Sequence, residues 1–219
     1  MNKILIIIFS LIIVGKLSGI LLQEVYETAP SSDDYDKYLE LETGVIYEGG
    51  LLIGKILSPI TNSLIGEDGL DVMISGNGAI LDLKGEQISI SFCENRLDIE
   101  NCIILNGNIR FRGINAELVA IPQGSVKYVT FYRPHDYGIR LQGTGEGIIL
   151  ERNLVIDAID TGYDYIYTTG ISSDWIPTGS NIAISIQAGF YGTPEVFDNW
   201  SYHSTPQINT DPLKHISAL

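Results

Sequence analysis

From residue 38 onward the chain is a succession of short apolar runs separated by glycine or asparagine. Runs such as "EQISISF", "NIRF", "SVKYVTF" and "YGIRL" mostly hold four to seven residues and alternate imperfectly between apolar and polar positions. Runs this short and this often interrupted are typical of strands, because a helix needs a longer uninterrupted pattern. The 23 glycines and the abundant Ile and Leu favour strands as well. We therefore predict an all-β chain.

The runs recur at a nearly constant spacing. Asn77 and Asn101 lie 24 residues apart, and Asn153 follows 52 residues after Asn101, which is twice 26. A period between about 20 and 50 residues is typical of a solenoid, in which stacked coils bury the apolar faces that no coil can bury alone. We predict a parallel β-helix of about five or six coils, followed by an irregular, aromatic-rich C-terminal loop region.

The stretch "RLDIENCIILNGNIRF", residues 96–111, shows what one coil contains. We predict that Asn101 is a turn residue between two strands, because asparagine tolerates a left-handed backbone, and that it is hydrogen-bonded to its equivalents in neighbouring coils. Cys102 is expected to fill a core position. The alternative is a disulfide with Cys93, which is chemically allowed in an exported protein.

The first 19 residues carry Lys3, an apolar run from Ile4 to Val14, and then Lys16, Ser18 and Gly19. An apolar run of this length falls short of the roughly 20 residues that span a bilayer. A basic start followed by a short apolar core is typical of a secretory signal. We predict a signal peptide at residues 1–19 and a secreted or cell-surface protein; the alternative is an uncleaved anchor, with membrane contact through this segment only.

Charge divides the remaining chain. The formal net charge is −14, and residues 20–42 hold seven acidic residues against one lysine. We predict a solvated acidic leader at residues 20–37, then the β-helix domain at residues 38–219, with a long loop region at residues 162–206. The final "KHISAL" has no obvious polar cap, so the chain could be a fragment or its open end could meet a partner.

Three stretches resemble the right-handed parallel β-helix proteins of the pectin-lyase-like superfamily. They are "LELETGVIYEGGLLI" (39–53), "ISGNGAILDLKG" (74–85) and "LDIENCIILNG" (97–107), and "INTDPL" (208–213) is similar to a segment near the end of bacterial β-helix domains. The resemblance covers residues 38–160 and implies the fold. It implies no catalytic residue: the Arg-x-Pro-x-x-Arg stretch of pectate lyases is absent from "YRPHDYGIR". Polygalacturonase-like hydrolases carry an Asp-Asp pair and Gly-His-Gly, but here no Asp-Asp pair occurs after Asp33-Asp34 and Gly-His-Gly is missing.

A first candidate site is "YRPHDYGIRL", residues 132–141, within a basic middle of the chain. Residues 110–152 hold six basic and four acidic side chains. Arg133, His135, Tyr137 and Arg140 could grip a carboxylate or sulfate on a sugar, with His135 or Tyr137 exchanging a proton. The alternative is a polar corner whose charges pair with each other, as Arg133 with Asp136. Nucleic acid is excluded as a partner, because the total charge repels phosphate.

A second candidate site is residues 157–179, where carboxylates alternate with aromatic rings. Asp160, Asp164 and Asp174 stand near Tyr167 and Trp175. Rings stack on sugars and carboxylates bind their hydroxyl groups, and clustered oxygens could also hold Ca²⁺. No calcium-loop spacing is present, so no metal ligand is assigned. The alternative is a loop folded on its own rings as a small satellite core.

Together these patterns predict a secreted protein that binds or cleaves an extracellular, acidic polysaccharide. The candidate catalytic residues are Arg133, His135, Arg140, Asp160 and Asp164, and the candidate substrate-binding residues are Tyr137, Tyr167, Asp174 and Trp175. If the chain is an enzyme, a polysaccharide lyase or glycoside hydrolase is expected. The alternative is a non-enzymatic adhesin or stalk module, favoured by the absence of the catalytic patterns.

Overall fold

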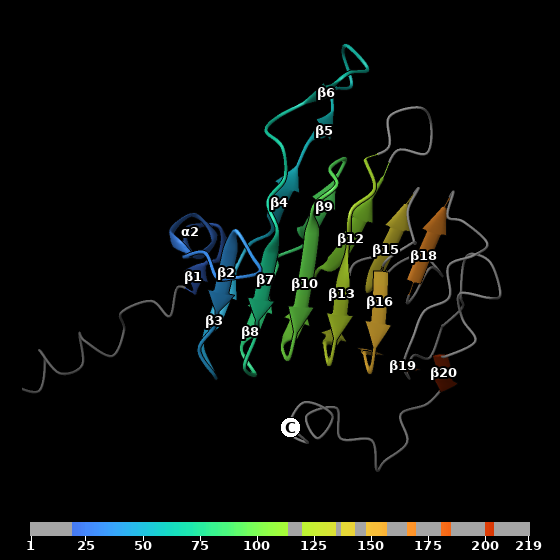
Figure 1. The fold of residues 1–219 in the computed structure, drawn as a ribbon. Coiled ribbons are helices and arrows are strands. Elements are labelled where there is room, and N and C mark those ends of the chain that lie inside the picture. Colours follow the sequence, from blue (N-terminus) through green and yellow to red (C-terminus); the bar gives the residue numbers. More distant parts are fainter. Residues whose placement is uncertain are drawn as a thin grey trace, which may run out of the picture.

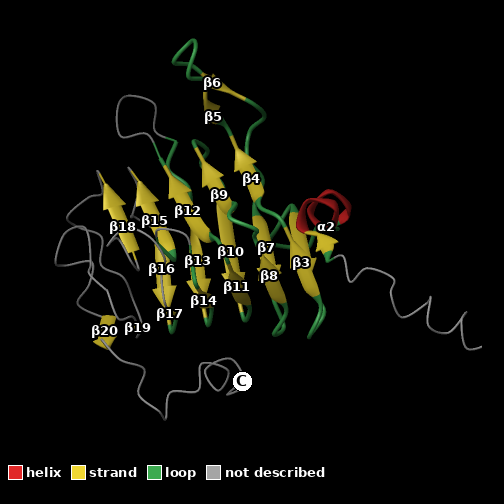
Figure 2. Ribbon diagram, turned by 180° about the vertical axis from the view of Figure 1, so that it is seen from behind, coloured by secondary structure: helices red, strands yellow, loops and turns green. Residues whose placement is uncertain are grey.

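The computed structural model describes residues 19–113, 120–134, 137–142 and 148–156, together with the backbone of three later strands, β18 (Ile166–Thr169), β19 (Asn181–Ile184) and β20 (Trp200–His203). Within these residues the structure is all-β apart from one short helix, α2 (Leu22–Thr28). Most strands pair in parallel and form three sheets, which pack around a common core (Figures 1 and 2). The arrangement is consistent with the predicted parallel β-helix.

We call the three sheets A, B and C. Sheet A contains β1 (Ile20–Leu21), β3 (Ile46–Glu48), β8 (Ile80–Asp82), β11 (Ile103–Leu105), β14 (Thr130–Tyr132), β17 (Leu154–Ile156), β19 and β20. Sheet B contains β2 (Lys37–Glu40), β7 (Val72–Ser75), β10 (Arg96–Glu100), β13 (Gln123–Lys127) and β16 (Ile148–Glu151). Sheet C contains β4 (Leu51–Gly54), β9 (Gln87–Ser91), β12 (Asn108–Arg112), β15 (Ile139–Gln142) and β18.

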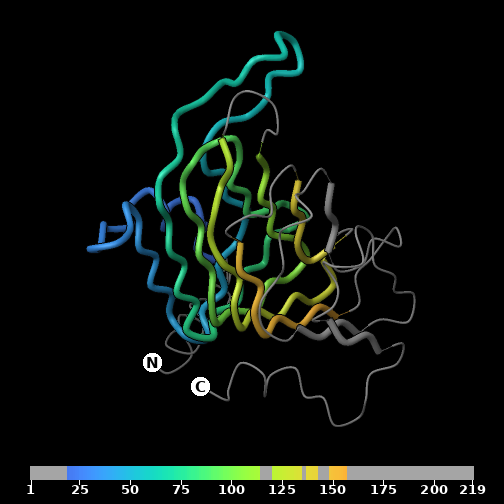
Figure 3. Tube along the Cα trace, turned by 45° about the vertical axis from the view of Figure 1, so that its right-hand side comes forward, coloured from blue at the N-terminus to red at the C-terminus, as the bar shows by residue number. Residues whose placement is uncertain are grey.

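From β2 to β18 the chain visits the three sheets in the order B, A, C and then begins again, as the tube in Figure 3 shows, whereas β1, β19 and β20 all belong to sheet A. One such passage, for example β10, β11 and β12, is called a winding below. An antiparallel hairpin of β5 (Ile56–Leu57) and β6 (Leu64–Ile65) lies between the first and second windings, after β4, and projects beyond the sheets (Figure 1). Each winding hydrogen-bonds to the next through its backbone, so every strand inside a sheet is paired on both sides.

The core lies between the three sheets and is built from columns of like side chains. In sheet B, Ile99 is in register with Ile74 on one side and Val126 on the other. In sheet C, Phe111 lies between Ile90 and Leu141, and all of these side chains are fully buried. Because parallel pairing without a shift places equivalent positions above one another, the alternation within each strand becomes a continuous apolar interior.

Every corner between sheets B and A from β7 to β17 contains a residue other than glycine with a left-handed backbone. Asn77, Asn101, Tyr128 and Arg152 have φ values of 49°, 56°, 55° and 53°. The prediction that Asn101 is a turn residue is therefore confirmed. The predicted hydrogen bonds between equivalent asparagines are not present, because the buried Asn101 Oδ1 has no partner and the next corners are Tyr128 and Arg152.

Asn153 stands one position after the corner and has a different role. Its side chain is completely buried, its Oδ1 accepts a hydrogen bond from Val129 N at 3.2 Å, and its Nδ2 donates to Val126 O at 2.8 Å. Asn153 therefore satisfies backbone groups of the preceding winding. Counting asparagines found the right period but took Asn153 as the equivalent of Asn101. The residue at the position of Asn101 is Arg152, one residue earlier in the chain.

The acidic segment does not lie ahead of the fold. Ile20 and Leu21 form β1, which pairs with β3, and the side chain of Leu22 in α2 is fully buried in the core. Lys37 already belongs to β2. The predicted leader at residues 20–37 is corrected accordingly: its few apolar residues cover the first winding, which would otherwise expose its apolar interior.

Both cysteines are free and buried. Cys102 is fully buried in the core, as predicted, and burial raises the pKa of its thiol to about 12. The thiol therefore stays protonated and unreactive at neutral pH. The alternative of a disulfide with Cys93 is not present in the structure.

Candidate functional site

The outer face of sheet C carries polar and cationic side chains on alternate residues. In β12, the apolar side chains of Ile109 and Phe111 point into the core. Asn108, Arg110 and Arg112 alternate with them along the strand and therefore lie on the other face. The pairing aligns Arg110 with Ser89 of β9 and with Arg140 of β15, and Arg112 with Ser91 and Gln142. The outer face therefore brings together residues from three successive windings.

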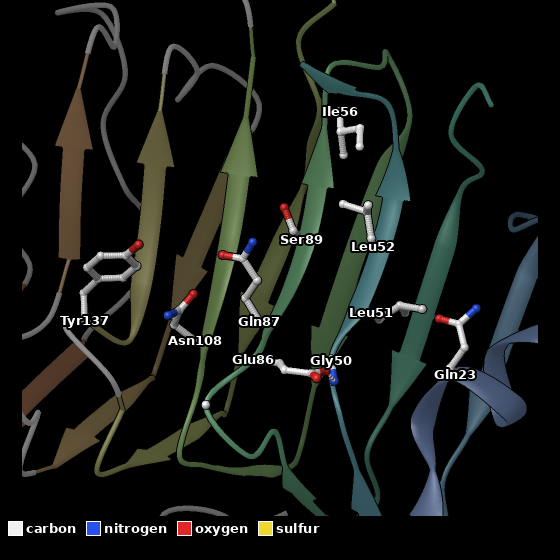
Figure 4. A pocket seen from close by; sticks show the side chains of 11 residues that line it. Gln23, Gly50, Leu51, Leu52, Ile56, Glu86, Gln87, Ser89, Asn108 and Tyr137 are labelled. Carbon is white, nitrogen blue, oxygen red and sulfur yellow. Dashed lines mark hydrogen bonds between the residues drawn. The ribbon is translucent and has the colours of Figure 1, made fainter. Parts of the chain in front are cut away.

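A groove with a volume of about 670 Å³ crosses this face. Residues from α2, β4, β9 and the segments next to them, β12 and the approach to β15 line it: Gln23, Gly50, Leu51, Leu52, Ile56, Gly85, Glu86, Gln87, Ser89, Asn108 and Tyr137 (Figure 4). Because these elements belong to successive windings, the groove runs across the strands and along the direction in which the windings stack.

The two ends of the groove differ in chemistry. Toward the end away from Tyr137, Leu52 and Ile56 are apolar, with 49% and 42% of their surface exposed, and Gln23 of α2 lies beyond them (Figure 4). The middle offers the amide groups of Gln87 and Asn108, and the largely buried ring of Tyr137 closes the opposite end (Figure 4). Amides bind hydroxyl groups, and an aromatic ring or aliphatic side chain contacts the apolar face of a ring compound.

Glu86 is the acidic side chain in the lining of this groove. Its carboxylate accepts a hydrogen bond from the backbone N–H of Gly50 at 2.6 Å, which joins β4 to the turn before β9. Gly50 has no room for a side chain, because a Cβ there would lie 2.5 Å from Gln87 O. The two strands therefore approach closely at the floor of the groove.

The arginines beside the groove are each held by a neighbouring side chain. Arg110 Nη2 donates a hydrogen bond to Gln142 Oε1, and Arg140 Nη1 donates to Tyr137 OH at 3.0 Å. The guanidinium of Arg112 lies 4.4 Å from the centre of the Phe92 ring. Burial lowers the pKa of Arg110 to about 10, with the charges of Arg140 and Arg112 adding to the shift. Burial and the Arg140 charge also lower the pKa of Arg112.

The structure describes three of the nine predicted site residues with their side chains. Tyr137 lines the groove, and Arg140 lies beside it on β15. Arg133 is an exposed corner residue with φ 50° between β14 and β15, and it is not part of the groove lining. The backbone of Tyr167 pairs with Arg140 in sheet C. His135, Asp160, Asp164, Asp174 and Trp175 lie outside the described residues and stay predictions.

Sequence reasoning missed the residues that make up most of this surface. Arg110 and Arg112 were counted only as charges, and Gln87 and Asn108 were not considered. The segment "NIRFR" carries the signal for the first pair, because two arginines alternating with buried Ile109 and Phe111 must share the outer face. No comparable local signal marks Gln87 and Asn108, whose importance comes from the windings they bridge.

Among the described residues, no group of three or more His, Cys, Asp or Glu side chains is placed to hold a metal ion. In the same part of the chain, no helix has the length and apolar character needed to cross a membrane. Comparisons with protein-family models, with curated proteins and with solved structures found no match to this chain.

Proposed function

We propose that this chain is a secreted, right-handed parallel β-helix of five or six coils, related to the pectin-lyase-like superfamily, that binds or cleaves an extracellular acidic polysaccharide. The resemblance of residues 38–160 and the repeated B, A, C order of parallel strands support the fold part of this proposal. The signal-like residues 1–19 support export.

The groove on sheet C carries the functional part of the proposal. A linear polymer needs an elongated surface that offers the same kinds of contact several times, and this groove crosses successive windings with amide, hydroxyl, aliphatic and aromatic groups in turn. A small molecule would be better served by an enclosed cavity. The arginines beside the groove favour a polymer that carries negative charge.

Cleavage would require further groups around this surface. In a lyase reaction, a base removes the proton next to a uronate carboxylate while an arginine or Ca²⁺ offsets the charge that develops. Arg133, His135, Arg140, Asp160 and Asp164 remain our candidates for catalysis, and Tyr137, Tyr167, Asp174 and Trp175 for substrate binding. Arg140 and Tyr137 support this best, because they lie at the groove and are hydrogen-bonded to each other.

Binding is tested by affinity electrophoresis of the full chain on a panel of neutral and acidic polysaccharides. Gln87→Trp places a large ring in the groove and is expected to weaken binding of the retained polymer at least tenfold. Lys127→Trp is the matched control, because Lys127 is a partly exposed strand residue on sheet B. Retention of no polymer by the unmodified protein, or equal binding by both variants, would contradict the proposal.

Cleavage is tested separately by incubating the protein with uronate polymers, with and without Ca²⁺, and recording ultraviolet absorbance of unsaturated product. A rise in absorbance supports a lyase. Binding without any product, by this assay or by reducing-end release, would favour the alternative function, a non-enzymatic adhesin or stalk module. That alternative is also supported by the absence from the sequence of the family's catalytic patterns.

A further inference from the structure

We propose that Arg110, Arg112 and Arg140 form a subsite on sheet C that binds an oxyanion of the ligand, either a carboxylate or a sulfate ester. This inference rests on the proposed function, because it assumes that the polymer lies along sheet C. It goes beyond that function by naming the residues that bind the negatively charged group of the ligand. Two of them, Arg110 and Arg112, were not among the predicted site residues.

The register of the strands brings the three arginines together. Arg110 of β12 is paired with Arg140 of β15, so their backbones are about 4.8 Å apart. Arg112 is two residues further along β12 on the same face, a separation of about 6.6 Å. Side chains at such positions can reach a common point above the sheet. In keeping with this, burial lowers the pKa values of Arg110 and Arg112, and the Arg140 charge lowers both further.

The guanidinium groups are oriented before any ligand arrives. Gln142 accepts a hydrogen bond from Arg110, the Phe92 ring supports Arg112, and the Tyr137 hydroxyl accepts a hydrogen bond from Arg140. Gln142 and Phe92 carry no charge, so they orient Arg110 and Arg112 without neutralising them. Side chains held in place in this way lose less conformational entropy on binding.

Arg110 and Arg112 have no ion-pair partner within the described part of the chain. The ion pairs among the described residues involve Lys55, Lys84, Arg96, Lys127 and Arg152, and none includes Arg110 or Arg112. The buried Arg110 Nε also has no hydrogen-bond partner. Like charges on paired strands destabilise a sheet. The chain has a net charge of −14, yet among the residues that the structure describes no carboxylate forms an ion pair with Arg110 or Arg112.

A ligand oxyanion would supply the missing counter-charge. Arginine presents N–H groups in a fixed fork that matches the two oxygens of a carboxylate or of a sulfate ester. Polymers carrying either group therefore share the chemistry that this subsite recognises. The groove next to it supplies the contacts to hydroxyl groups, which a neutral polymer would also use.

The experiment compares polymers that share a backbone and differ in charge. Affinity electrophoresis is run with polygalacturonate against its carboxyl-reduced neutral form, and with dextran sulfate against dextran. We expect Arg110→Gln and Arg112→Gln to weaken binding of the charged member of at least one pair about tenfold or more, which corresponds to the loss of one charge-assisted contact. Binding of the neutral member is expected to be unchanged. Which pair responds identifies the oxyanion as carboxylate or sulfate.

Arg152→Gln is the matched control, because it removes the same charge at the corner between sheets B and A, where Arg152 donates a hydrogen bond to Tyr128. Arg110→Lys keeps the positive charge but loses the paired N–H donors of the guanidinium group, so the affinity of this variant for the charged polymer should be intermediate. Thermal unfolding of every variant shows whether it is folded, and the arginine variants should be no less stable than the unmodified protein, since mutual repulsion is relieved.

Three results would overturn the inference. Equal binding of charged and neutral members, unaffected by Arg110→Gln and Arg112→Gln, would leave the groove as a polysaccharide site and remove the oxyanion subsite. Equal weakening by Arg152→Gln would mean that only the overall charge matters. If no polymer of either pair binds, and the panel above retains none, the proposed function fails together with the inference.

Discussion

At the scale of single residues, glycine decides how closely the windings approach. Gly124 of β13 has φ +140° and is paired with Leu97 of β10. A Cβ built on Gly124 would lie 1.9 Å from Leu97 O, which is a backbone atom and cannot move independently of its strand. By contrast, Gly44 has φ +75° and a Cβ there would contact nothing within 4 Å. A side chain at Gly44 would therefore meet only backbone strain, whereas one at Gly124 would also clash with the neighbouring strand.

We predict that Gly124→Ala destabilises the protein much more than Gly44→Ala. The Gly44 variant should lose about 1 to 2 kcal/mol, the cost of a left-handed backbone at a residue with a Cβ. The Gly124 variant must in addition displace β10 or β13, so its loss should be at least twice as large. Urea unfolding followed by circular dichroism measures both free energies of unfolding. Similar losses for the two variants would show that the close approach at Leu97 is unimportant.

At the scale of elements, α2 covers the first end of the sheets. The helix has seven residues and no side-chain cap at its N-terminus, so its own hydrogen bonds contribute little stability. Its position depends on Leu22, which is fully buried in the core, and on Val25 and Tyr26, which pack against the same core. The neighbouring Leu21 belongs to β1 and has 48% of its surface exposed.

Leu22→Ala is expected to lower the free energy of unfolding by about 2 to 5 kcal/mol, the usual loss when a buried leucine is truncated. Leu21→Ala is the matched control and should change it by no more than about 0.5 kcal/mol. Thermal and urea unfolding of the two variants provide the measurement. If both variants resemble the unmodified protein, α2 does not contribute to the stability of the first winding.

At the scale of the whole molecule, one polar network ties the N-terminal segment to windings far along the chain. Tyr35 OH donates a hydrogen bond to Asp98 Oδ2 at 2.8 Å, and Ser125 Oγ and Arg96 Nε also donate to this carboxylate. Asp98 has only 6% of its surface exposed, so it depends on these donors. Hydrogen bonds thereby connect Tyr35, which precedes β2, to residues of β10 and β13 in sheet B.

We predict that Tyr35→Phe costs about 1.5 to 3 kcal/mol of unfolding free energy, the range for a hydrogen bond to a charged group. In an Asp98→Asn background the same change should cost clearly less, because the charged acceptor has been removed. Tyr38→Phe serves as control, since the Tyr38 hydroxyl makes no hydrogen bond among the described residues. Additive losses from Tyr35→Phe and Asp98→Asn in urea unfolding would contradict a coupling between them.

The fold was largely predictable because its main signals are local. Alternation in "NIRFR" and "EQISISF" identifies strands and their buried faces, and the near-constant spacing of corners indicates repeated windings. The error at Asn153 has a physical origin. Register in a parallel ladder is set by backbone pairing and core packing, so Tyr128 and Arg152 occupy corner positions that a count of asparagines assigns differently.

The candidate site was predictable only in part, because its members come from different windings. Tyr137 and Arg140 were recognised as one polar cluster in a short segment, whereas no local signal marks Gln87 and Asn108. Their proximity follows from the pairing of β9, β12 and β15. Nothing in the separate segments indicates that pairing.

The sequence by itself determined that this chain forms short strands with one apolar face each. The reason is that successive side chains of a strand point to opposite faces, so the pattern depends only on neighbouring residues. Only the tertiary structure decided which outer residues become neighbours, as for Arg110 and Arg140, which are 30 residues apart in the chain. The physical reason is that the alignment of one winding on the next depends on core contacts between distant segments, and these form only when the windings are stacked.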